Sequence, residues 1–104
     1  MKINFNNREI ELKFNFRSDM IYENIQKKSF KAETETDWVV YFYSTYLSLT
    51  QDTQLDFDTC VDLLSEDPGV LFIFIKWYTD YQTNVLNIVN HPEEGEGAED
   101  GKNA

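Results

Sequence analysis

Five carboxylates are the side chains of this 104-residue chain that come closest to a chemical site: Asp56, Asp58, Asp62, Glu66 and Asp67. Closely spaced acids are typical of calcium loops, but Cys60 stands where the third acidic ligand belongs and Val61 where the glycine belongs. Several of these acids also fall in expected first turns of helices, where negative charge is favourable for the helix dipole alone. We therefore interpret them as helix-stabilising surface charges and predict no metal site.

The single histidine and the single cysteine do not complete a site either. His91 stands next to Pro92, without a second ligand at metal-binding spacing. Cys60 has no basic neighbour within a helical turn to lower its pKa, so a packing role is expected. One cysteine also excludes an internal disulfide, as suits a reducing cytosol. With no glycine-rich phosphate loop in addition, we expect no catalytic residue and no cofactor, and so no enzyme.

The net charge of −10 is unevenly distributed along the chain. Residues 1–31 carry seven Lys/Arg against four acids, residues 32–92 one against ten, and residues 93–104 one against five. An acidic body opposes contact with phosphates, which excludes direct nucleic-acid binding. The start of the chain lacks the apolar region of a signal peptide, and no segment approaches the roughly 20 apolar residues of a membrane span. We expect a soluble, unprocessed protein.

The elements that carry these residues predict an α+β fold that is mostly α. Alternating polar and apolar residues predict an N-terminal β-hairpin over 2–16, with Ile3, Phe5 and the apolar residues up to Phe16 on one face and a turn at Asn6-Asn7. Ser18 is the expected cap of the helix that follows the hairpin, and Thr36 or Asp37 is the expected cap of the helix at 37–49. About four helices, at 18–28, 37–49, 57–66 and 68–90, complete a single globular domain over 1–91. The acidic tail, 92–104, is expected to be disordered.

The most apolar segment follows Asp67, and its flanks favour a helix over a buried strand. Pro68 suits the first helical position, and Leu71, Phe74 and Tyr78 continue an apolar stripe at helical spacing. The 37–49 and 68–90 helices are both apolar nearly all round, which is hard to cover in a chain of this size. We expect part of this surface to bind another protein or a second copy of the chain. The candidate partner-binding residues are Phe42, Tyr43, Tyr46, Phe72, Ile73 and Trp77.

The order of parts resembles the tail assembly chaperones of long-tailed bacteriophages. Residues 3–17, INFNNREIELKFNFR, are similar to their opening hairpin, and the aromatic-Glu pair of the following helix is here Tyr22-Glu23. The family usually has a glycine where Lys27 or Lys28 stands. The segments 55–58, LDFD, and 67–68, DP, look like the entry to its third helix and the start of its last helix, so the resemblance covers residues 1–90.

The resemblance implies a non-enzymatic function. Members of this family bind the long, aggregation-prone tape measure protein in the cytoplasm of the bacterial host, keep it soluble, and help tail tube protein assemble around it. They are absent from the mature virion. A phage or prophage origin, a role in virion morphogenesis and protein–protein interaction are expected on this ground.

A different class of binding protein is the alternative. A small acidic inhibitor or nucleic-acid mimic could occupy a basic groove on a host or phage enzyme. Its contact residues would be the surface acids Asp52, Asp56, Asp58, Asp62, Glu66 and Asp67. Binding by mimicry should weaken steeply with ionic strength, whereas binding through apolar stripes should not.

Overall fold

The computed structural model describes residues 1–90, with side chains described through residue 85, and His91 and the acidic tail lie outside this range. An antiparallel hairpin of β1 (Lys2–Phe5) and β2 (Arg8–Glu11) is followed by four helices, which confirms the predicted fold class. The helices are α1 (Phe16–Gln26), α2 (Glu35–Thr50), α3 (Phe57–Glu66) and α4 (Pro68–Asn90). No helix of the described part is long and apolar enough to cross a bilayer.

The hairpin forms around a turn that uses two asparagines. Asn6 and Asn7 both have positive φ, 53° and 61°, which a tight turn matching the strand twist requires and which asparagine tolerates. Ile3 and Ile10 are cross-strand partners, and both are buried. The expected alternation of apolar and polar faces is therefore present in the strands.

The predicted hairpin range 2–16 is too long, because the second strand ends at Glu11. Leu12 donates its backbone N–H to the carbonyl of Met1. Residues after Leu12 have no partner in the first strand, so the pairing stops there. Phe14 leaves the sheet and stacks on Tyr81 of α4, with ring centroids 4.8 Å apart.

Two predicted helix caps are wrong by a few residues. Asn15, and not Ser18, caps α1, since its side chain accepts the Ser18 N–H at 3.0 Å while Ser18 is buried in the first turn. Thr34 caps α2 and forms a capping box with Asp37. Helix α1 also ends at Gln26, earlier than predicted, because Lys27 adopts a left-handed conformation with φ 60°.

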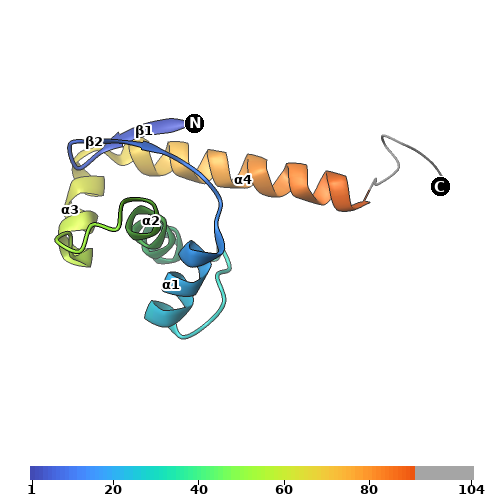
Figure 1. Cartoon of the computed structure of the whole chain (residues 1–104), viewed down its shortest axis with the longest axis horizontal. Helices are drawn as coiled ribbons and strands as arrows, with labels where there is room; N and C mark the ends of the chain where they lie inside the picture. The colour runs from blue at the N-terminus through green and yellow to red at the C-terminus, as the bar shows by residue number, and fades with distance from the viewer. Residues whose placement is uncertain (91–104) are drawn as a thin grey trace.

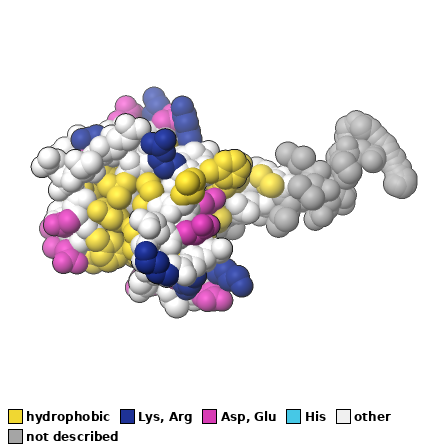
Figure 2. Space-filling view, turned by 60° about the horizontal axis from the view of Figure 1, so that its bottom comes forward, with side chains coloured by type: hydrophobic (Ala, Val, Ile, Leu, Met, Phe, Trp, Pro, Cys, Tyr) yellow, Lys and Arg dark blue, Asp and Glu magenta, His cyan; other side chains and the backbone are white. Residues whose placement is uncertain are grey.

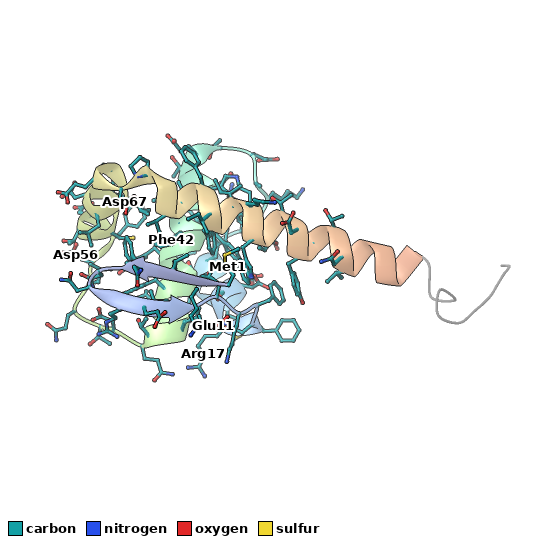
Figure 3. All side chains as sticks on the ribbon, turned by 90° about the horizontal axis from the view of Figure 1, so that it is seen from above. Met1, Glu11, Arg17, Phe42, Asp56 and Asp67 are labelled. Carbon is teal, nitrogen blue, oxygen red and sulfur yellow. The ribbon has the colours of Figure 1, made fainter. Side chains whose placement is uncertain are left out.

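The core combines aromatic and aliphatic side chains and is centred on α2 (Figure 1). Helix α1 packs on one side of α2, while α3, α4 and the hairpin cover others. Phe42 lies between the hairpin and α4 (Figure 3), with its ring 4.8 Å from Phe5 and 5.2 Å from Phe74, both edge-to-face. The C-terminal part of α4 continues past the body of the domain (Figures 1 and 3).

Candidate partner-binding site

Two carboxylates are buried among residues 1–85, and both form contacts that stabilise the fold. Asp37 accepts hydrogen bonds from the Tyr22 hydroxyl at 3.0 Å and from the backbone N–H groups of Glu33 and Thr34 at 3.2 and 3.0 Å. Lys28 lies 3.5 Å away. Burial acts to raise the pKa of Asp37, but these hydrogen bonds outweigh it and hold that pKa below its ordinary value. Asp37 therefore joins α1 to the start of α2.

Asp52 plays the same part at the other end of α2. The Tyr46 hydroxyl donates to it at 2.6 Å, the Gln54 N–H at 2.8 Å, and Arg8 of β2 lies 3.7 Å away. The Tyr46 hydrogen bond is the main reason that the pKa of Asp52 lies below its ordinary value. The expectation that Asp52 is a surface acid available to a partner is wrong, because its own chain already uses both oxygens.

These two aspartates predict a loss of stability in acid. Because their pKa values are lower in the folded chain than in the unfolded chain, their contribution is present at neutral pH and is lost as pH falls below about 4. The urea midpoint of unfolding should therefore drop between pH 5 and pH 3. Asp52→Asn should make this drop smaller, whereas Asp58→Asn, a change at an exposed residue of α3, should leave it unchanged. Equal pH profiles for wild type and Asp52→Asn would contradict the assignment.

Cys60 and Asp56 have structural roles in the described part of the chain. Cys60 is fully buried, and burial raises the pKa of its thiol to about 12, so the thiol stays protonated and packs as an apolar group. Asp56 caps α3 by accepting the Thr59 N–H at 2.8 Å. Among the described residues, no three His, Cys, Asp or Glu side chains are placed to share a metal ion.

Two of the six predicted partner-binding residues belong to the core. Phe42 and Tyr46 are each only 2% exposed. Both pack against Phe5, and Tyr46 is also held by Asp52. Their placement on a partner surface is wrong, because the hairpin covers this side of α2.

Two more of the six are half-buried and already have contacts within the chain. The Tyr43 hydroxyl donates to the Leu55 carbonyl at 2.8 Å, and its ring lies edge-to-face with Phe57. Trp77 lies between Phe74 and Tyr81 on α4. Part of each side chain is therefore covered within the chain and part remains accessible.

Phe72 and Ile73 are the two predicted residues that face solvent, with 63% and 44% of their surface exposed. Phe72 forms one wall of a groove of about 200 Å³ where α2, α3 and α4 meet. The other lining residues are mostly apolar: Val39, Val61, Leu64, Pro68 and Leu71, with Glu35 and Ser65. This groove with its exposed Phe72, which we call the α4 groove, is the candidate partner-binding site.

A second exposed apolar cluster on α1 was missed by sequence reasoning. Phe16 is 78% exposed and Met20 65%, and an open depression beside them is lined by Arg17, Met20 and Ile21. Phe16 was assigned to the inner face of the hairpin, because the alternation of polar and apolar residues continues past the point where the strand ends. The cap sequence beginning at Asn15 is the signal that could have placed Phe16 in the first turn of a helix.

Acidic groups lie at one end of the body, beside apolar side chains (Figure 2). Asp56 and Asp67 lie at the two ends of α3, across the body from Arg17 (Figure 3). Figure 2 shows hydrophobic side chains gathered at the end of the body away from the C-terminal half of α4, with acidic groups along their outer edge. The acidic and apolar surfaces of the molecule are therefore neighbours.

Comparisons with protein-family models, with curated proteins and with solved structures find no match for the chain.

Proposed function

We propose that this protein is a non-enzymatic tail assembly chaperone of a long-tailed phage or prophage, which binds the tape measure protein and keeps it soluble. In this proposal it acts in the cytoplasm of the bacterial host, aids assembly of tail tube protein and is absent from the finished virion. The observation that carries the binding role is the α4 groove, where Phe72 remains exposed beside an apolar lining, and Ile73, the next residue of α4, is exposed as well. Grooves of this kind receive the apolar face of a partner helix.

The residues that carry the resemblance to the chaperone family have clear structural roles, and these roles support the resemblance. Tyr22 is fully buried, packs edge-to-face on Phe30 and donates to Asp37. Lys27 has φ 60°, a backbone conformation that glycine adopts without strain, and it is one of the two positions, Lys27 or Lys28, where the family usually has glycine. Tyr22 and Lys27 therefore determine how α1 packs and where it ends. The client-binding surface is formed by other residues.

Co-expression tests the proposal. The tape measure protein of the same phage or prophage should be insoluble alone and should co-purify with this chain when both are produced together. Static light scattering of the complex gives the number of chaperone copies per client and reports any homo-oligomer of the free chain. An insoluble client in both cases, with a monomeric chain that binds no apolar dye, would count against the proposal.

Salt dependence separates the proposal from the acidic-mimic alternative. The exposed acids left to a mimic are Asp58, Asp62, Glu66 and Asp67, since Asp52 is buried and Asp56 caps α3. A complex held mainly by such charges dissociates as salt rises from 0.1 to 1 M, because the Debye length shrinks from about 10 to about 3 Å. A complex held mainly by apolar contacts in the α4 groove should persist and lose only the smaller contribution of its acidic edges.

A further inference from the structure

The α4 groove is built from a part of the chain without positive charge. Residues 32–75 contain nine acids and no Lys or Arg, and they include all of α2, all of α3 and the first turns of α4. Two of the nine acids, Asp37 and Asp52, are buried in the contacts described above. The other seven are exposed. Glu35 is the one charged residue among those that line the groove, and the one Lys or Arg of α4, Lys76, lies one turn after Phe72 and is paired with Asp80 at 3.0 Å.

Three of the exposed acids form a row along α3. Asp58, Asp62 and Glu66 follow one another at four-residue intervals, so they lie one above the other on the helix surface, next to the groove-lining Val61 and Ser65. Like charges at this spacing repel each other by a few tenths of a kcal/mol per pair. In the described part of the chain, no Lys or Arg lies within salt-bridge distance of them.

The opposite side of the groove carries Glu35 in the first turn of α2. The apolar floor, Leu64 and Leu71, thus lies between an acidic row and a further acid. The volume of about 200 Å³ is below the roughly 300–1,000 Å³ of a typical small-molecule pocket, and it suits one or two apolar side chains. An apolar strip with acidic edges is complementary to an apolar strip with basic edges.

We infer that the α4 groove receives an amphipathic helix whose apolar stripe is flanked by Lys or Arg. This inference rests on the proposed function and names the kind of tape measure segment that the groove selects. The chain's own residues 91–104 do not fit this description, since they contain five acids, one Lys and no aliphatic residue larger than Ala. Steering by the acidic edges also speeds the encounter with a basic client.

Two synthetic helical peptides test the inference on the purified full chain. Both carry the same leucine stripe, one flanked by lysines and the other by glutamates, and their binding is measured by fluorescence anisotropy at 50 and 150 mM salt. The lysine peptide should bind at least tenfold more tightly than the glutamate peptide. Equal affinities would overturn the inference.

Paired variants locate the binding. Asp62→Asn/Glu66→Gln should weaken the lysine peptide about three- to tenfold, while the control Glu9→Gln/Glu23→Gln, with the same change in net charge on exposed residues of β2 and α1, should not. Phe72→Gln should weaken it as well, because the apolar contact lies in the groove. Full affinity in Phe72→Gln, or equal losses in the two charge pairs, would overturn the inference.

The outcomes also separate this inference from the proposed function. If the tape measure protein co-purifies but the two peptides bind equally, the chaperone role stands and the charge preference is wrong. If the lysine peptide binds as expected but the tape measure protein does not co-purify, the groove chemistry stands and the client assignment is wrong. A self-associated chain that becomes monomeric in Phe72→Gln would show that a second copy, and not a basic helix, fills the groove.

Discussion

Replacing Phe72 and Ile73 with glutamine is expected to abolish co-purification of the tape measure protein while the chain remains folded. Both side chains are exposed, so their loss removes little from the core. Central apolar contacts of an interface each contribute about 2 kcal/mol or more, and the double variant should weaken binding by more than about thirtyfold. Glutamine keeps a good helix propensity and adds no charge, so the effect isolates the apolar contact.

The matched control places the same change on the other exposed apolar cluster. Phe16→Gln/Met20→Gln removes a comparable amount of exposed apolar surface from α1. Pull-down yield and circular dichroism should show normal binding and normal helix content for this variant. Equal loss of binding in both double variants would mean that general surface hydrophobicity, and not the α4 groove, holds the client.

Phe74→Ala is expected to have the largest effect on stability. Phe74 is fully buried, and its ring lies edge-to-face with Phe42 and Trp38 of α2. Phenylalanine-to-alanine changes in a core cost about 3–5 kcal/mol, because the transfer free energy is lost and a cavity remains. Total stabilities of small domains are about 5–15 kcal/mol, so much of the folding free energy should disappear.

Two further variants of α4 are controls for Phe74→Ala when the free energy of unfolding is measured with urea. Phe74→Leu should cost less, about 1–2 kcal/mol, because most of the volume is retained. Phe72→Ala, two residues away on the exposed side of the same helix, should change the unfolding free energy by less than about 0.5 kcal/mol. Similar losses for Phe72→Ala and Phe74→Ala would contradict the described packing of α4.

Local sequence signals predicted the types of the elements well. The predicted starts of α3 and α4, at residues 57 and 68, agree with the structure, because a side-chain cap such as Asp56 and a proline act within one turn. The apolar segment 37–49 is a helix, as predicted. The errors at the end of β2 and the start of α1 arose because alternation alone does not show where a strand loses its partner.

The candidate site was predicted only in part, because burial depends on contacts distant in sequence. Phe42 and Phe72 look alike in an apolar helix, yet Phe42 is covered by Phe5 of the hairpin, whereas 63% of the surface of Phe72 is exposed. The acidic row was visible in the spacing of the residues on α3. Its position beside an apolar groove depends on how α2, α3 and α4 meet, and the sequence pattern does not contain that information.

The docking of the hairpin on α4 has a consequence for biosynthesis. Phe5 and Phe74 both contact Phe42, so the first strand and the last helix complete one core. An isolated two-stranded hairpin is marginal in water. During translation, the apolar face of the hairpin therefore remains uncovered on its α4 side until most of the chain has left the ribosome. A protein proposed to protect another from aggregation therefore has an aggregation-prone apolar surface of its own during its synthesis.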